Sequence, residues 1–96
     1  MQFTWDERKN RSNKSKHGVP FEAAILVFDD PYHLSRPDRD VGGELRWHTL
    51  GTVPGMHVLL VAHTLSEPGE DGEETIRMIS ARKATPRERS AYAQGI

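Results

Sequence analysis

Three consecutive strand-like segments in the second half of the chain constrain the fold more than any other feature. They span residues 44–50, 56–65 and 74–82. The first and third alternate apolar and polar residues, and the second is the most apolar part of the chain, as is typical of β-strands. Residues 51–55 predict a tight hairpin, and the acidic, Gly-rich residues 66–73 predict a longer solvated loop. The sequence therefore predicts an antiparallel meander.

A short strand and a polar helix are expected before this meander. Residues 1–5 alternate, with both aromatic side chains on one side, and predict a strand at a sheet edge. Asp6 fits a helix N-cap and Gly18 fits the left-handed residue after a helix, so a first helix is expected over about residues 7–16. Few of its residues are apolar, and we expect it to lie on the surface with its basic side exposed.

A second helix and a long connection are expected next. Pro20 suits the first turn of a helix, and four apolar residues then recur at helical spacing, namely Phe21, Ala24, Ile25 and Phe28. Residues 29–31 end this pattern. The polar residues 31–43, which contain Pro37 and two adjacent glycines, predict a long connection without regular structure.

A final helix is predicted after the meander. Thr85 fits its N-cap, Pro86 its first position, and Glu88 completes a capping box, while Gly95 ends the helix. The order strand, two helices, three strands and helix predicts an α+β fold, with the helices packed on one face of a small antiparallel sheet. A chain of 96 residues suits one domain, and we expect residues 1–96 to form it.

The formal net charge of -1 hides an uneven distribution of charge. Residues 1–17 carry five Lys or Arg and two acidic residues. Residues 18–74 carry three Lys or Arg and eleven acidic residues, and residues 75–96 carry five Lys or Arg and one acidic residue. A chain with this pattern presents cationic sites to an anion while it stays close to neutral overall.

Composition and spacing exclude several classes of chemistry. The chain has no Cys, which rules out disulfides, thiolate metal sites and thiol nucleophiles. It contains no HExxH, no calcium-loop spacing, no Gly-rich phosphate loop and no dinucleotide fingerprint, so we expect no metal and no cofactor. The longest apolar run, residues 58–62, is far shorter than the roughly 20 residues that span a bilayer. We therefore expect a cytoplasmic protein without membrane contact.

The last predicted strand and the turn after it carry a cluster of cations. Alternation places Arg82 in phase with the apolar Ile76 and Met78, and it places Arg77 on the opposite face. Lys83 continues the basic run to the start of the final helix, where free backbone N–H groups also favour anions. We interpret this end of the sheet as a candidate phosphate site.

Other polar side chains on the strands and the final helix are weaker candidates. Arg46 and His48 share one face of the first strand of the meander, and His63 lies on the second. Each residue also has an ordinary explanation. A single His on a strand is more often a surface or core residue than a catalyst, Glu88 is explained by capping, and Tyr92 lies at a spacing typical of core residues.

Short segments along nearly the whole chain carry a resemblance to one protein family. In the N-terminal half these are F-T-W-D-E at residues 3–7, K-N at 9–10, Asn13, K-H-G-V at 16–19, F-E at 21–22 and V-F-D at 27–29. In the C-terminal half they are G-E-L-R at residues 43–46, Gly51, I-R-M-I-S-A-R-K-A at 76–84, E-R at 88–89 and Tyr92. In this order the segments resemble the BrnT toxins of type II toxin–antitoxin systems. The chain departs from the pattern of this family at Ser66, where an Arg is usual.

The resemblance implies a RelE-like fold and a ribonuclease that arrests translation. It also implies a cognate BrnA-like antitoxin with a ribbon-helix-helix DNA-binding domain, and a toxin–antitoxin complex that binds operator DNA and represses its own operon. Contact with operator DNA would come only through the antitoxin complex.

Metal-independent RNA cleavage would assign chemical roles to these residues. The ribose 2′-OH attacks the adjacent phosphate, which requires a base, stabilisation of phosphorane charge and a proton donor. The expected phosphate-stabilising residues are Arg77, Arg82 and Lys83, with support from Arg46. Proton transfer has four candidates, among which the sequence does not choose: His48, His63, Glu88 and Tyr92. The expected RNA-binding residues are Lys9, Lys16, Arg77, Arg82 and Lys83.

Two alternatives stay open at the level of sequence. The chain is either a non-catalytic binding module whose basic ends dock an acidic or nucleic-acid partner, or a degraded toxin that retains only antitoxin binding. The substitution at Ser66 is compatible with the second. Replacement of the candidate acid and base residues would leave the activity of a binding module unchanged, whereas loss of its Lys and Arg would weaken binding in a salt-dependent way.

Overall fold

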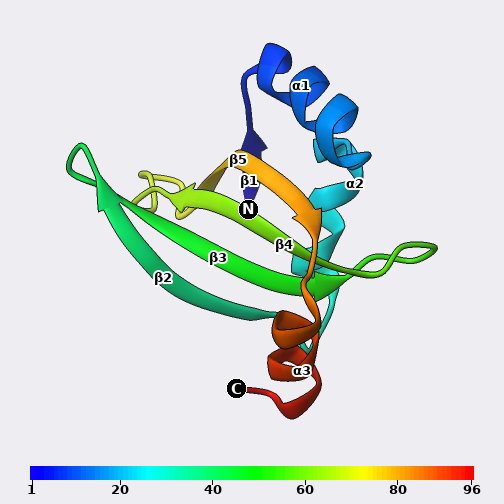
Figure 1. The fold of residues 1–96 in the computed structure, drawn as a ribbon. Coiled ribbons are helices and arrows are strands. Elements are labelled where there is room, and N and C mark those ends of the chain that lie inside the picture. Colours follow the sequence, from blue (N-terminus) through cyan, green and yellow to red (C-terminus); the bar gives the residue numbers. More distant parts are fainter.

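A computed structural model describes residues 1–96, and it confirms the α+β class. A five-stranded sheet in the order β1-β5-β4-β3-β2 forms the centre of the molecule (Figure 1). The elements follow the chain as β1 (Gln2–Thr4), α1 (Glu7–His17), α2 (Phe21–Ala24), the 3-10 helix η1 (Ile25–Asp29), β2 (Leu34–Val41), β3 (Glu44–Thr52), β4 (Val58–Leu65), β5 (Thr75–Lys83) and α3 (Pro86–Gln94).

The sheet contains both parallel and antiparallel pairs. The prediction of an antiparallel sheet is correct for the meander and wrong for the N-terminal strand β1. Strands β3, β4 and β5 pair antiparallel, as their connections predict. Strand β1 instead pairs parallel with β5, with Phe3 opposite Ile76. No hairpin joins β1 to β5, because three helices and three strands separate them along the chain. No tight turn therefore imposes an antiparallel direction on this pair.

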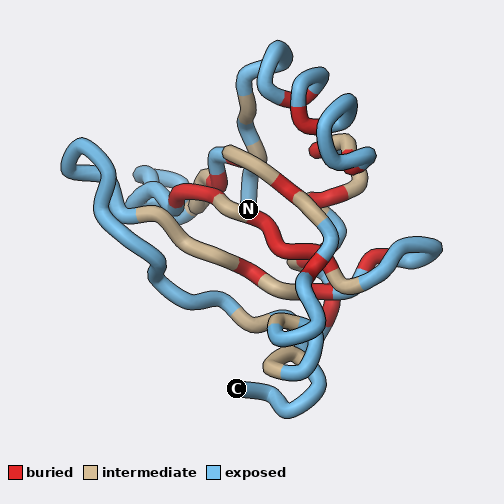
Figure 2. Tube along the Cα trace, in the orientation of Figure 1, coloured by how far each residue is buried: buried red, intermediate tan, exposed pale blue.

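Residues 31–43 do not form the long connection predicted from their composition, because most of them belong to strand β2. This strand pairs antiparallel with β3 at the sheet edge, and nearly all of it is exposed (Figure 2). An edge strand tolerates polar residues and a proline such as Pro37, which hide the strand signal. The turn from β2 to β3 contains Gly42 and Gly43, both with left-handed φ angles of 61° and 82°, as a two-residue hairpin requires.

The core lies on one face of the sheet, beneath α2 and η1. Its largest fully buried side chains include Phe21 and Val27 from these helices and Leu59, Ile76 and Met78 from the strands. The second helix predicted from the sequence divides here into a short α-helix and a tighter 3-10 turn. Hydrophobic contact between these helices and one sheet face leaves the other face free for polar residues.

Gly51 of β3 lies directly against Val27 of η1. A Cβ atom at position 51 would lie 2.9 Å from both the Cβ and the carbonyl oxygen of Val27. Real Cβ atoms do not approach other heavy atoms so closely. The side chain of any residue other than glycine would therefore push η1 away from the sheet.

Helix α1 is polar, as predicted, and it is attached to the core by two buried asparagines. The side chain of Asn13 donates to the carbonyl oxygens of Val19 and Ala81, each at 2.8 Å, and accepts from the Ala81 N–H at 3.1 Å. Asn10 accepts from the Phe21 N–H at 2.8 Å. Amide hydrogen bonds therefore replace the apolar stripe that usually docks a helix. None of the helices has the length and apolar character needed to cross a membrane.

Candidate active site on the open face of the sheet

The sheet face opposite the core carries most of the cationic side chains of the strands, and we call it the open face. Its members are Leu34 and Arg36 of β2, Arg46, His48 and Leu50 of β3, Leu60, Ala62 and Thr64 of β4, and Arg77, Ser80 and Arg82 of β5. Residues directly opposite each other on neighbouring strands project from the same face. The register pairs Arg46 with Thr64, and Thr64 with Arg77.

A β-bulge in β5 brings Arg77 and Arg82 to the same face. Met78 lies opposite His63 and Ser80 lies opposite Ala62, so Ile79 is an extra residue in this strand. A bulge shifts the alternation by one position, and residues beyond it change faces. The sequence prediction that Arg82 points in phase with the buried Met78 is therefore wrong. A prediction from simple alternation cannot detect an inserted residue.

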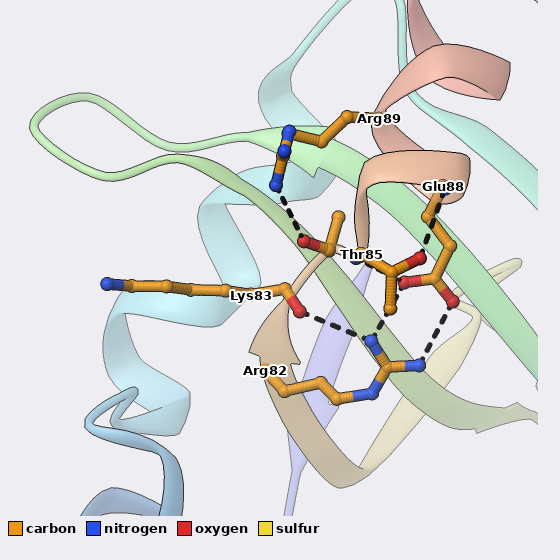
Figure 3. A network of polar contacts seen from close by, with 6 residues as sticks. Arg82, Lys83, Thr85, Glu88 and Arg89 are labelled. Carbon is orange, nitrogen blue, oxygen red and sulfur yellow. Dashed lines mark hydrogen bonds and ion pairs between the residues drawn. The ribbon is translucent and has the colours of Figure 1, made fainter.

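Arg82 forms a bidentate ion pair with Glu88 at the start of α3 (Figure 3). Its two terminal nitrogens donate to the two carboxylate oxygens at 2.8 and 3.0 Å. The hydrogen bonds from Arg82 are the main reason that the pKa of Glu88 falls to about 2, and the same contact raises the pKa of Arg82. Glu88 also completes the predicted capping box with Thr85. This carboxylate therefore stays ionised and holds Arg82 in place.

Lys83 does not accompany Arg82, although it is the next residue. It lies opposite Leu59, which belongs to the core face, and its side chain points away from Arg82 (Figure 3). There it lines a cavity of about 280 Å³ with His57 and Gly18. Alternation on this strand therefore separates two cations that the sequence prediction placed in one site.

His48 is the histidine of the open face, and it has an acidic neighbour. Its Nε2 lies 3.5 Å from the Oδ2 of Asp38, which belongs to an irregular part of β2 between Pro37 and Asp40. Both side chains are more than one-third exposed, at 37% and 38%. The His48 ring is therefore accessible from the open face while one of its nitrogens faces a carboxylate.

Arg46 lies in the same row of the open face as Thr64 and Arg77, and it has no acidic partner. Its Nε is buried and has no hydrogen-bond acceptor in the structure, which is unusual for a charged group. Arg36 also makes no ion pair, whereas Arg77 at the far end is paired with Glu44. Two unpaired guanidinium groups beside His48 fit an anionic ligand such as a phosphate.

His63 lies away from this group of residues, in the protein core. It is 2% exposed, and its ring meets Phe28 edge-on with centroids 5.1 Å apart. Its Nε2 lies 2.7 Å from Thr49 Oγ1, and its Nδ1 lies 3.2 Å from the carbonyl oxygen of Thr64. Burial lowers the pKa of His63, which favours the neutral ring. The structure therefore places His63 out of reach of a ligand on the open face.

Tyr92 anchors α3 to the chain segment that precedes β2. Its hydroxyl donates to Asp30, whose carboxylate also accepts from the backbone N–H groups of Thr52 at 2.8 Å and Tyr32 at 2.9 Å. Burial alone would raise the pKa of Asp30, but these hydrogen bonds lower it to about 2. The bond to Asp30 in turn raises the pKa of Tyr92. The phenol is therefore held in its protonated form as a structural donor.

Lys9 and Lys16 are exposed on α1, which is attached to β5 through Asn13 and the backbone of Ala81. Neither lysine belongs to the strands that form the open face.

Three residues near the site were not among the candidates drawn from the sequence. Arg36 and Asp38 were assigned to a connection, because the polar composition of β2 hides its alternation. Arg87 was noted only as part of the basic C-terminal block. It lines a cavity of about 270 Å³ between α3 and the open face, together with Arg36 and His48. A larger cavity, of about 490 Å³, lies elsewhere, and its charged lining residues are all acidic: Glu44, Glu67 and Glu74. No three His, Asp or Glu side chains come together to hold a metal ion.

Two comparisons with known proteins found proteins similar to this chain. The model of a family described as "Ribonuclease toxin, BrnT, of type II toxin-antitoxin system" matches residues 5–88, which include all four strands of the open face. The 1.1 Å crystal structure of the Brucella abortus ribonuclease toxin BrnT has a similar fold, with a TM-score of 0.61 and 22% sequence identity. That match covers 88% of this chain and 97% of the Brucella chain. A search of curated proteins found no match.

Proposed function

Because this chain belongs to the family of BrnT ribonuclease toxins of type II toxin–antitoxin systems, we propose that its open face cleaves RNA without a metal ion. The observation that carries the proposal is that His48, Arg36, Arg46 and Arg82 all lie on one face of the sheet. The bulge at Ile79 is essential to it, because without the extra residue Arg82 would point into the core.

The reaction begins when the ribose 2′-OH attacks the neighbouring phosphorus. A bond forms between O2′ and phosphorus, and the bond from phosphorus to O5′ breaks, which leaves a 2′,3′-cyclic phosphate and a 5′-hydroxyl. The 2′-OH loses its proton to a base, and O5′ receives a proton from an acid. Negative charge accumulates on the non-bridging oxygens in between, and donors placed there in advance lower the barrier.

We assign the proton transfer to His48. Its neutral ring takes the 2′-OH proton, and the resulting imidazolium is stabilised by Asp38 at 3.5 Å. Glu88 is a poor base because its pKa is about 2. The hydrogen bonds of His63 and Tyr92 support structural roles for both residues.

The guanidinium groups supply the positive charge. Arg46 has a buried Nε without an acceptor, and Arg36 lies opposite His48 on the neighbouring strand. Arg82, which is held by Glu88, has one further nitrogen to offer. Three such groups stabilise a dianionic phosphorane, which is the task that a metal ion performs in other nucleases.

Cleavage of RNA in excess EDTA tests this mechanism. We expect full activity in chelator, and activity that disappears and returns with a divalent cation would overturn the metal-free mechanism. His48→Gln should reduce kcat by about 100-fold or more, as expected for loss of a general base. His57→Gln, on the exposed β3–β4 hairpin, is the matched control.

A second pair of variants tests the faces of β5. Arg82→Ala should reduce cleavage strongly, whereas Lys83→Ala should retain most of it, because the two neighbouring cations lie on opposite faces. Equal losses would contradict the open-face site. If wild-type protein arrests growth but cleaves no RNA, the alternative of a non-catalytic binding module is favoured instead.

A type II system implies an antitoxin, and we further propose its nature and the setting of the toxin. We expect a BrnA-like ribbon-helix-helix antitoxin that neutralises the toxin and forms with it a complex that represses the operon. The toxin, acting as one domain over residues 1–96, would inhibit translation by cleaving RNA in the cytoplasm. Expression of the toxin alone should arrest growth, and co-expression of the antitoxin should restore it. Unchanged growth with the toxin alone would contradict this.

A further inference from the structure

The cavity between α3 and the open face has a composition suited to a flat ring that carries polar groups at its edge. Its volume is about 270 Å³. The apolar lining comes from Leu34, Leu50, Leu60 and Ala91, and two cations, Arg36 and Arg87, stand among these residues. Ligand sites commonly combine an apolar lining with a few polar groups that fix orientation, at volumes of about 300 to 1,000 Å³ for drug-sized molecules. This cavity is therefore sized for a single ring system.

The cavity is held open by two polar attachments of α3. Arg82 and Glu88 tie its first turn to the sheet, and Tyr92 ties its middle to Asp30. None of the residues of α3 is fully buried. The helix is thus fastened to the sheet without being packed closely on it, and the cavity is already formed before a ligand binds.

We propose that this cavity binds one unpaired base of the RNA substrate, next to the cleaved phosphate, and that it prefers guanine. The inference rests on the proposed function. His48 lines the cavity as well as the phosphate site, so a base in the cavity belongs to a nucleotide that flanks the reacting bond. Proteins read single-stranded RNA through bases that are turned out of the stack and held by apolar and Arg side chains.

The preference for guanine follows from the hydrogen-bonding groups of the cavity. Neither Arg36 nor Arg87 has an acidic partner, so both are free to donate. Glu88 already accepts from both terminal nitrogens of Arg82 and from the Thr85 N–H. The cavity therefore offers two unpaired arginine donors, whereas its one carboxylate is already engaged by three donors. Guanine presents two neighbouring acceptors, O6 and N7, that an arginine binds together, whereas adenine presents an amino donor at the same place.

Short RNAs with a single cleavable linkage test this inference. All sugars except one are 2′-O-methylated, so that cleavage occurs at one position, and the base on either side of it is varied among the four. We expect kcat/KM to be on the order of tenfold higher with guanine at one of the two positions. Arg87→Ala and Ala91→Leu, which remove the donor and fill the cavity, should abolish this preference.

Matched controls lie outside the cavity. Ala93→Leu makes the same change on an exposed part of α3, and Arg8→Ala removes an exposed cation from α1. Both should keep the wild-type preference. Equal cleavage of all sequences by wild-type protein, or a guanine preference that survives in Ala91→Leu, would overturn the base site and leave the ribonuclease proposal intact. Failure to cleave any of the RNAs would overturn both.

Discussion

Arg82 at the end of β5 and Glu88 in the first turn of α3 are joined by two hydrogen bonds of 2.8 and 3.0 Å. The same carboxylate accepts from the Thr85 N–H at 2.8 Å. One side chain therefore caps the helix, attaches it to the sheet and positions the guanidinium group of Arg82. Under the proposed mechanism, this contact couples stability to activity.

Glu88→Gln should destabilise the fold by about 1 to 2 kcal/mol, the range expected for a weakened cap and ion pair. The effect depends on pH, because the pKa of Glu88 is lowered from 4.5 to about 2. The stabilisation is complete above pH 4.5 and is lost as the pH falls toward 2. Urea unfolding at pH 5 and pH 3 should show a smaller loss of stability in the variant than in wild type. Equal losses would contradict the pairing.

Tyr92→Phe should lower stability by about 1 to 2 kcal/mol, because buried Asp30 loses one of its donors. We expect RNA cleavage to keep most of its rate and the same dependence on pH. The check is thermal unfolding together with the pH–rate profile. A variant that is as stable as wild type but inactive would show that Tyr92 transfers a proton.

His63 should make the fold sensitive to mild acid. Burial lowers its pKa below 6.5, so the unfolded chain binds a proton that the folded protein does not. Stability should therefore fall as the pH drops below about 6.5, by about 1 kcal/mol between pH 7.5 and 5.5. Urea unfolding at these two pH values measures the change. His63→Gln should remove most of it, and His57→Gln, as control, should not. The same pH dependence in both variants would assign it to other groups.

Gly51→Ala should destabilise the fold by about 1 to 3 kcal/mol, because the added methyl group would meet Val27 at 2.9 Å and displace η1. Gly69→Ala provides the control, since this glycine lies in the exposed β4–β5 loop and its Cβ would meet only the flexible side chain of Asp71 at 3.3 Å. We expect a change within about 0.5 kcal/mol there. A Gly51→Ala variant with wild-type stability would show that η1 moves away at no cost.

Local signals in the sequence were sufficient to predict most of the secondary structure. Asp6 and Thr85 cap helices as predicted, and the meander has the predicted antiparallel pairing. These features depend on neighbours in sequence, through capping bonds and alternation. Strand β2 was missed, because at a sheet edge only one side is paired and its polar residues need not be buried. The family resemblance gave the ribonuclease class, which the residue pattern alone did not.

The sequence by itself determined which residues are available for phosphate chemistry, namely the basic C-terminal block, Arg46 and His48. Only the tertiary structure decided which of them share a surface. One inserted residue, Ile79, placed Arg82 on the same face as Arg46 and left Lys83 on the other face. Pairing with the edge strand added Arg36 and Asp38 to the open face, and burial placed His63 in the core. Strand register and burial are long-range properties, because they depend on contacts between segments that are distant in the chain.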